Sequence, residues 1–259
     1  MTKPGSLRLD VPALIRVFAC DIDGCLAAAG HADYDLEAFA RLADLSRSST
    51  SDPAVPALTL VTGRPHAYVD ALSQALAITL PMSFENGVGL ATRHPYRYWL
   101  DPRAEEGRGP LRRFAEAVES TDHLTLQPGK VASLSVFPRQ ADRDLSELAT
   151  ELAEMLERLG LELEIDPSTD CVNVLVPGVS KLTGFAWLCN EIGVMPEQVA
   201  GIGDSVGDAP WLEVCGVSFA PANAVGEVKA VVTHASAQPD VAAVVEAYEA
   251  LAAANRRLA

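Results

Sequence analysis

The sequence predicts an α/β fold, in which a parallel β-sheet flanked by helices carries an inserted α+β domain. Two observations predict the sheet: near each end of the chain, short apolar runs stop at polar turns, and they alternate with amphipathic helical segments. A third observation predicts the insertion, because the middle of the chain shows strands of alternating polarity next to long helices. An apolar fraction of 49% is enough to give both parts a buried core.

The first two strands and helices of the sheet are expected before residue 77. Residues 15–20, IRVFAC, form an apolar run that stops at Asp-Ile-Asp-Gly, and the helical pattern LEAFARLADL follows. A second apolar run, ALTLV, ends in Thr-Gly-Arg-Pro and leads into a helix from about residue 66 to 76. This strand–helix–strand–helix order is typical of a parallel sheet.

The inserted domain is expected over residues 86–178, with connections at 81–89 and 177–180. Residues 1–85 and 179–259 then form the core domain. The sequence LRRFAEAVES predicts a helix, KVASLSVF a strand, and LSELATELAEMLERLG a long helix. Alternating polarity in LELEI and CVNVLV predicts two strands of an antiparallel sheet that has helices on one face.

The pattern of the core domain returns after residue 179. The segment LTGFAWLCNEIG predicts a helix that stops at a glycine, and VAGIG predicts a short buried strand before Asp204. The segments PWLEVCG, VSFAP and VGEVKAV continue the alternation. The Ala-rich stretch VAAVVEAYEALAAANRR predicts a closing helix with cations in its last turn.

Charge and cysteine content limit the partners and the location of the protein. With 35 acidic and 20 basic residues, the net charge of −15 repels phosphate backbones, so nucleic acid is not expected as a partner. No stretch approaches the about 20 apolar residues of a membrane helix, so no membrane partner is expected. The five cysteines form no CxxC pair, and their odd number favours reduced thiols in a cytoplasmic protein. Nothing in the sequence indicates an oligomeric state.

Polar side chains follow the predicted strands of the core or begin its helices. Because the carboxyl ends of parallel strands meet at one edge of a sheet, these residues can converge although they are far apart in sequence. Each group alone has an ordinary structural explanation, such as an Asp-Gly turn, a helix cap, a surface lysine or a solvated acidic turn. The residues are Asp21 and Asp23 after the first strand, Thr62 and Gly63 after the second, Lys181 at a helix start, and Asp204 and Asp208 after a later strand.

Together these groups supply what phosphoryl transfer needs. Two carboxylates two residues apart cannot both be buried cheaply without a cation; one can attack phosphorus and the other can move a proton. The Thr62 hydroxyl and free backbone N–H groups suit a phosphoryl oxygen. Lys181 stands where the helix dipole disfavours a cation, which an opposing anion would explain. Asp204 and Asp208 offer oxygen ligands for Mg²⁺.

In the order FACDIDGCL, LVTGRP, GVSKLTG and GIGDSVGD, the chain resembles the haloacid dehalogenase-like hydrolase superfamily, and within it the Cof-like, sugar-phosphatase branch. The resemblance implies a Rossmann-like core and a C2-type α+β cap between the second and third motifs, where the insertion is expected. It also implies that Asp21 attacks the phosphorus and becomes an aspartyl-phosphate. Asp23 would protonate the leaving oxygen and then activate water.

The same resemblance implies roles for the other motif residues. Thr62 and Lys181 would hold the phosphoryl oxygens. The metal ligands for Mg²⁺ would be Asp21, the backbone carbonyl of Asp23, and Asp204, while Asp208 would ligate the ion or orient its waters. Two positions depart from the family pattern: Cys25 stands where Thr is usual, and Gly207 stands where the branch often has Asn.

The sequence therefore predicts a Mg²⁺-dependent phosphatase that acts on a small phosphorylated metabolite. By the resemblance, the substrate is a sugar phosphate, phosphoglycolate or a glycosyl-phosphoglycerate. Gly63, Arg64 and Asn86 are expected to contact it, and Lys130 and Asn173 of the inserted domain are further candidates. Two alternatives are a phosphomutase of the phosphomannomutase type and a non-catalytic sensor of a phosphorylated ligand.

Overall fold

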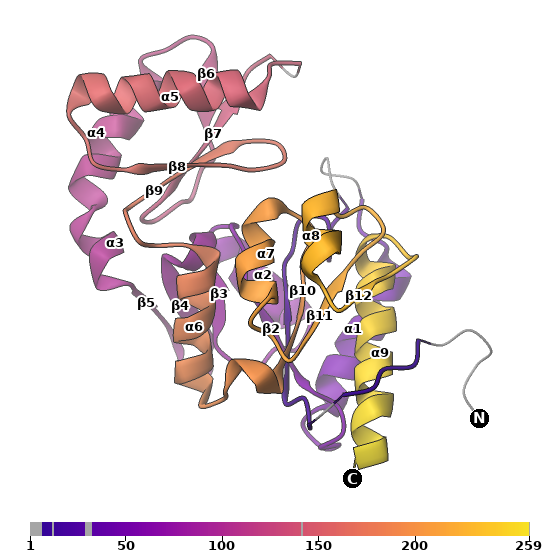
Figure 1. The fold of residues 1–259 in the computed structure, drawn as a ribbon. Helices are drawn as coiled ribbons and strands as arrows, with labels where there is room; N and C mark the ends of the chain where they lie inside the picture. The colour runs from indigo at the N-terminus through magenta and orange to yellow at the C-terminus, as the bar shows by residue number, and fades with distance from the viewer. Residues whose placement is uncertain (1–6, 12, 29–32, 141, 259) are drawn as a thin grey trace.

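A five-stranded parallel sheet forms the centre of the larger domain (Figure 1). The structure is a computed structural model that describes residues 7–11, 13–28, 33–140 and 142–258. The strands of the parallel sheet lie in the order β12 (His234–Ala235), β11 (Val217–Ala220), β10 (Val199–Ile202), β1 (Val17–Cys20) and β2 (Ala57–Leu60). The four longer strands coincide with the apolar runs that predicted them, whereas β12 was not expected.

The register of the sheet brings three strand ends to one level. Cys20 at the end of β1 pairs with Ile202 of β10 and with Leu60 of β2, and both pairings are parallel. The residues that follow these strands therefore emerge at the same edge of the sheet. This confirms the α/β fold class and explains how distant polar residues can meet.

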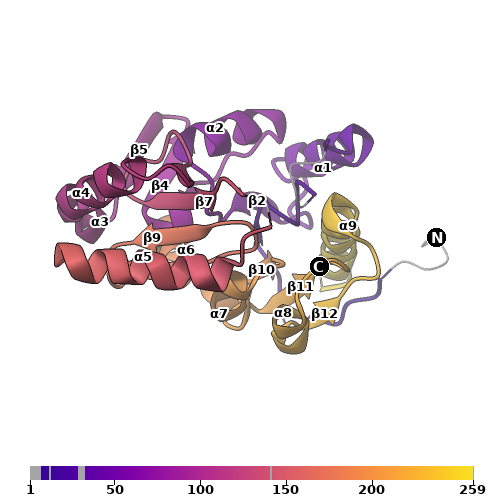
Figure 2. The ribbon, with the colours of Figure 1, turned by 90° about the horizontal axis from the view of Figure 1, so that it is seen from above.

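Helices cover both faces of this sheet, as Figures 1 and 2 show. In β1, Phe18 and Cys20 pack in one apolar cluster while Val17 and Ala19 pack in another, so the strand is buried on both faces. The first cluster includes side chains of α1 (Leu36–Ser48), α2 (His66–Ala75) and α9 (Asp240–Leu258). The second includes side chains of α6 (Lys181–Ile192), α7 (Ala209–Leu212) and α8 (Gly226–Val231).

A small antiparallel sheet, which the sequence did not indicate, lies between the two domains. It consists of β3 (Met82–Phe84), β4 (Gly89–Arg93) and β5 (Tyr96–Leu100), and a 3₁₀ turn at Glu85–Gly87 joins β3 to β4. Leu90 and Ala91 of β4 pack in the apolar clusters of the core. The division of the chain at residues 86 and 178 stays a proposal.

The remaining sheet is antiparallel and has helices on one face. Its strands are in the order β6 (Leu124–Leu126), β7 (Leu134–Pro138), β9 (Val172–Leu175) and β8 (Glu164–Pro167). Val136 of β7 and Val174 of β9 pack in one cluster with side chains of α3 (Pro102–Glu106), α4 (Arg108–Glu119) and α5 (Leu145–Leu159). Ser135 and Asn173 are each adjacent in sequence to one of these valines and pair with each other, so their side chains lie on the other face of the sheet.

Two strand expectations were wrong in part. The run LELEI predicted a strand over residues 161–165, but β8 begins at Glu164 and continues to Pro167. The run KVASLSVF predicted a strand from Lys130, but β7 begins at Leu134, and residues 130–133 form a loop. The backbone N–H groups of Val131 and Ala132 donate to the Glu85 carboxylate instead of to a neighbouring strand. None of the helices that the structure describes is long and apolar enough to cross a membrane.

Candidate active site

Three buried carboxylates converge at the edge of the parallel sheet where β1 and β10 end. In the part of the chain that the structure describes, one oxygen each of Asp21, Asp204 and Asp208 lie within 4.8 Å of one another. Asp21 directly follows β1, and its backbone N–H donates to the Ile202 carbonyl of β10 at 3.0 Å. The Asp23 side chain lies further out and is 49% exposed.

Lys181 neutralises part of this cluster. Its Nζ donates to Asp21 Oδ2 and to Asp208 Oδ1, both at 2.8 Å, and its side chain is only 10% exposed. Ser180 caps α6, so Lys181 is the first residue of that helix, as expected. Burial acts to lower the pKa of Lys181, but Asp208 and Asp21 together raise it well above its ordinary value. Lys181, which was expected to face an opposing anion, thus contacts two carboxylates, those of Asp21 and Asp208.

The pKa values of the carboxylates separate according to their partners. Burial, and then the negative charge of Asp208, raise the pKa of Asp21 and bring that of Asp204 to about 7. Asp208 is buried as well, but Lys181 and other donors hold its pKa below the ordinary range. Crowded carboxylates with raised pKa values are the condition that a bound cation relieves.

Hydrogen bonds occupy both oxygens of Asp208. Lys181 and Trp211 Nε1 (3.0 Å) donate to Oδ1, while the Asp204 N–H and both the N–H and hydroxyl of Ser205 donate to Oδ2. These bonds tie Asp208 to Lys181, to Trp211 and to the turn at residues 204–205. Sequence reasoning missed Trp211, whose only signal is its place three residues after Asp208.

The turn after β2 brings Thr62, Gly63 and Asn86 together. Thr62 is fully buried, its Oγ1 accepts from the Arg64 N–H at 3.1 Å, and its carbonyl accepts from the Asn86 N–H at 2.9 Å. A Cβ added to Gly63 would lie 2.8 Å from Asn86 Oδ1, so only glycine admits this contact. Asn86 is 5% exposed and has φ 56°, and its Nδ2 has no hydrogen-bond partner among the described residues.

Arg64 holds the Asp23 carboxylate with two hydrogen bonds. Its Nε donates to Asp23 Oδ2 at 2.7 Å and its Nη2 donates to Oδ1. The guanidinium lies over the Tyr68 ring at 4.7 Å, and the Tyr68 hydroxyl is hydrogen-bonded to that of Tyr34. The bond to Asp23 raises the pKa of Arg64, which therefore stays charged.

The loop at residues 130–133 contacts the core at the same place. Lys130 Nζ donates to the Gly63 carbonyl at 2.6 Å. The buried Glu85 carboxylate accepts from Val131 N at 2.8 Å, Ala132 N at 3.1 Å and Ser133 Oγ at 2.8 Å. The inserted domain is thus tied to the turn that carries Thr62.

The helix-free face of the inserted sheet is polar near the site. Ser135, Asn173 and Asp166 are neighbours across β7, β9 and β8, and Ser135 Oγ donates to Asn173 Oδ1 at 2.7 Å. Burial raises the pKa of Asp166, and the positive charge of Lys181 acts against this rise.

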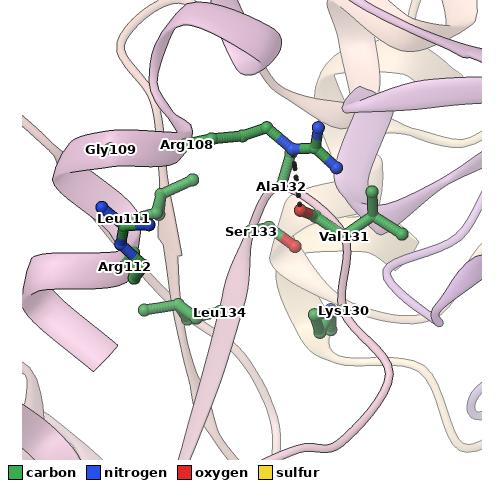
Figure 3. A pocket seen from close by; sticks show the side chains of 9 residues that line it. All are labelled: Arg108, Gly109, Leu111, Arg112, Lys130, Val131, Ala132, Ser133 and Leu134. Carbon is green, nitrogen blue, oxygen red and sulfur yellow. Dashed lines mark hydrogen bonds between the residues drawn. The ribbon is translucent and has the colours of Figure 1, made fainter. Parts of the chain in front are cut away.

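A cavity of about 440 Å³ opens on the flank of the inserted domain (Figure 3). It shares Lys130 with the contact described above, but none of the clustered carboxylates lines it. Its lining residues are Arg108, Gly109, Leu111, Arg112, Lys130, Val131, Ala132, Ser133 and Leu134.

Residues 91–247 match the family model described as haloacid dehalogenase-like hydrolase. The chain belongs to this family. A phosphoglycolate phosphatase of Nitrosopumilus maritimus is 26% identical to it over 92% of this chain and 96% of that protein. A phosphoglycolate phosphatase of Methanococcoides burtonii is 25% identical over 82% of this chain and 85% of that protein.

Solved structures share the fold of this family member. A protein of Thermoplasma acidophilum has a TM-score of 0.73 at 19% identity, with 92% of this chain and 99% of that one covered. The sucrose-phosphatase of Synechocystis, in complex with sucrose and phosphate, has a TM-score of 0.66 at 17% identity, with 92% and 98% covered. The family match and the two phosphoglycolate phosphatase relatives together show that the chain is a phosphoric monoester hydrolase.

Phosphatases of this family generally use a divalent metal, and the carboxylate cluster fits one. Carboxylate oxygens are the ligands that hard divalent cations prefer. Gly24 makes room for them, because a Cβ added there would lie 2.1 Å from Asp204 Oδ2. Asp21 and Asp204 thus have the chemistry, the burial and the space that a metal site needs.

Proposed function

We propose that this enzyme removes the phosphoryl group from a small phosphorylated metabolite with the help of Mg²⁺, and that Asp21 is its nucleophile. One observation carries the proposal: Lys181 connects the buried Asp21 to Asp208, within 4.8 Å of Asp204. Lys181 orients Asp21 and opposes the rise in its pKa, and a bound cation would act in the same direction; both favour the charged carboxylate that attacks phosphorus.

In the proposed reaction Asp21 forms a bond to phosphorus while the bond from phosphorus to the ester oxygen breaks. Asp23, which is more exposed than Asp21, gives its proton to the leaving oxygen. It then takes a proton from the water that attacks the aspartyl-phosphate, so that inorganic phosphate leaves and Asp21 is regenerated. This order restores both carboxyl groups after each turnover.

Four groups are proposed to hold the phosphoryl oxygens: the Thr62 hydroxyl, the Gly63 N–H, Asn86 Nδ2 and Lys181 Nζ. Asn86 Nδ2 is buried and has no acceptor in the part of the chain that the structure describes, which supports this, because such a donor is costly unless a ligand accepts from it. Preorganised donors of this kind stabilise the charge that develops on the phosphoryl group.

Asp21, Asp204 and the backbone carbonyl of Asp23 would hold Mg²⁺. The ion, when bound, supplies neutralisation of the negative charge on the phosphoryl group. Asp208 is proposed to position Lys181 and the turn at Asp204, since five donors already occupy its oxygens.

The proposed substrate is a sugar phosphate, phosphoglycolate or a glycosyl-phosphoglycerate. The phosphoglycolate phosphatase relatives support the second class and the sucrose-phosphatase neighbour supports the first. Arg64 beside Asp23 and the polar side chains of Asp166 and Asn173 are proposed to contact the part of the substrate that leaves. A cytoplasmic location is also proposed, which the free state of all five cysteines supports.

Release of inorganic phosphate from a panel of phosphorylated metabolites, measured with Mg²⁺, tests this function. We expect release by the wild type and loss of release in Asp21→Asn, which keeps the shape of the side chain. Release that survives in Asp21→Asn would sink the proposed mechanism. Isomerised sugar phosphate with little release would indicate a mutase, and binding without turnover would indicate a sensor.

A further inference from the structure

We propose that the cavity on the flank of the inserted domain is a second binding site, which takes a small organic phosphate. The cavity lies between the first turn of α4 and residues 130–134, and its volume is about 440 Å³ (Figure 3). Pockets for small organic molecules typically measure about 300–1,000 Å³. Asp21, Asp204 and Asp208 do not line it, so a ligand bound here would leave the carboxylate cluster free.

The walls of the cavity carry positive charge in a protein whose net charge is −15. Arg108 and Arg112 both line it, and they lie four residues apart on α4, a spacing that places side chains on the same face of a helix. Arg108 also reaches the opposite wall, where its Nε donates to the Val131 carbonyl at 3.5 Å (Figure 3). None of the nine lining residues is acidic. An anion in the cavity would therefore meet two guanidinium groups.

The acidic residues that contact these walls do not line the cavity. Glu105 Oε1 accepts from Arg108 Nη1 at 2.9 Å, and Glu116 Oε1 lies 4.0 Å from Arg112 Nε. Both ion pairs join exposed side chains, and such pairs add little stability, so an anion can compete for the guanidinium groups. The carboxylate of Glu85 is buried and is already bound to three donors of residues 131–133.

The lining favours a phosphoryl group that is joined to a small organic group. A phosphomonoester carries a charge of about −1.5 to −2 at pH 7, which matches the two arginines. A planar guanidinium binds phosphate oxygens with two parallel hydrogen bonds. The remaining lining includes the apolar side chains of Leu111 and Leu134, which an organic group would cover. Inorganic phosphate cannot make this second contact.

One wall of the cavity belongs to the loop that contacts the candidate active site. Lys130 lines the cavity, and its Nζ donates to the Gly63 carbonyl at 2.6 Å. Val131 and Ala132 line it as well, and their backbone N–H groups donate to Glu85. A ligand that bridges α4 and this loop would hold the loop in its contact with the core. Occupancy of the cavity should therefore slow amide hydrogen exchange in the loop.

An NMR titration with phenylphosphonate tests this proposal, because its P–C bond is not a phosphoester that the enzyme could hydrolyse. With EDTA present, so that no metal assists binding at the carboxylates, we expect saturable shifts of the amide signals of Gly109 and residues 131–134, with a Kd below about 1 mM. Inorganic phosphate should bind at least about 10-fold more weakly, since it leaves the apolar lining uncovered. With phenylphosphonate at about 10 times its Kd, hydrogen exchange in residues 131–133 should slow about several-fold.

Variants of the lining locate the binding. The double variant Arg108→Gln/Arg112→Gln should weaken binding of phenylphosphonate by about 10- to 100-fold, because it removes charge-assisted hydrogen bonds. Arg113→Gln is the matched control, since Arg113 lies on the same helix but does not line the cavity, and its Kd should equal that of the wild type. Gly109→Glu is a second probe: an added Cβ would meet nothing within 4 Å, so the variant should keep its fold, and the new negative charge should weaken binding.

Several results would overturn the second site. They are no saturable shift at Gly109 up to about 10 mM phenylphosphonate, shifts confined to the residues around Asp204 and Asp208, and equal Kd values for the double variant and Arg113→Gln. Equal binding of inorganic phosphate would overturn the organic phosphate as the ligand class. Unchanged exchange in residues 131–133 with the ligand bound would overturn the coupling to the loop. The proposed phosphatase function stands or falls separately, by the release of inorganic phosphate.

Discussion

Asp21 and Asp208 share the single cation of Lys181, and this sharing sets the charge of the site. The ammonium group balances only one of the two carboxylates, and Asp204 adds a third acidic group beside them. Breaking a buried ion pair by removing one partner typically costs about 3–5 kcal/mol. Lys181 is therefore expected to stabilise the fold as well as to hold phosphoryl oxygens.

Gly24 is a residue at which a single methyl group should disturb the metal site. It has φ 73°, and an added Cβ would lie 2.1 Å from Asp204 Oδ2. Because Asp204 would have to move, we expect Gly24→Ala to lower kcat/KM by about 100-fold or more and to weaken Mg²⁺ binding. Steady-state kinetics over a range of Mg²⁺ concentrations measures both effects.

Gly193 is the matched control for this substitution. It has φ 76°, and an added Cβ would meet nothing within 4 Å. Gly193→Ala should cost about 1–2 kcal/mol of stability from backbone strain and leave kcat/KM unchanged. Similar activity losses in both variants would show that strain, not the contact with Asp204, is responsible.

At the scale of single residues, the sequence predicts which residues form the site better than it predicts the partners that they contact. Asp21, Asp204, Asp208 and Lys181 follow strands or begin a helix, so their convergence can be inferred from the topology of a parallel sheet. The contact of Trp211 with Asp208 could not be, because it depends on how a side chain from a short helix turns back into the site.

The turn at Glu85–Gly87 connects the two domains through one buried carboxylate. Glu85 accepts three hydrogen bonds from residues 131–133. In Glu85→Gln an amide NH₂ replaces one acceptor and faces donors, so these bonds should weaken by about 1–3 kcal/mol. We expect amide hydrogen exchange in residues 131–133 to become about 10- to 100-fold faster, measured by mass spectrometry.

Glu249→Gln serves as the control for this exchange experiment. Glu249 accepts two hydrogen bonds from Arg41 on the surface of the core, and its side chain is 48% exposed. Exchange in residues 131–133 should match the wild type in that variant. Unchanged exchange in Glu85→Gln would mean that other contacts hold the loop.

Elements with strong local patterns were predicted and those that depend on distant partners were not. The helix α5 and the strands β1 and β10 carry clear periodicity or an unbroken apolar run. The hairpin of β4 and β5 has exposed residues such as Tyr96 and Tyr98 and forms against β3, so its sequence alone does not distinguish it from a connection. The run from Lys130 is typical of a strand because most of its residues are apolar, but the backbone N–H groups of Val131 and Ala132 donate to the Glu85 carboxylate.

At the scale of the whole molecule, the carboxylates of the metal site should make stability depend on pH. The pKa of Asp204 rises from 3.8 to about 7 on folding, so its contribution to stability is full below pH 3.8 and is lost as the pH rises to about 7. Asp208, whose pKa is lowered, loses its contribution only in acid. Stability of the metal-free protein should therefore fall between about pH 4 and pH 7.

Mg²⁺ should reverse this loss, because it binds the ionised carboxylates. With Mg²⁺ about 100-fold above its Kd, we expect Tm to rise by about 5–10 °C at pH 8 and by much less at pH 5. Thermal unfolding with Mg²⁺ or with a chelator, at equal ionic strength, measures the shift. Asp204→Asn should abolish most of it, and an equal shift at both pH values would argue against this site.

The role of Asp21 as the phosphoryl acceptor is the central claim, and intact-protein mass measurement of Asp23→Asn tests it most directly. With p-nitrophenyl phosphate, whose leaving group needs no acid, this variant should form the aspartyl-phosphate but hydrolyse it slowly, since the amide that replaces the Asp23 carboxylate would not activate water. We predict that the protein gains the mass of one phosphoryl group on the peptide that contains Asp21, and that Asp21→Asn in the same background prevents the gain. Phosphate release without any such adduct, or an adduct on another residue, would contradict the account.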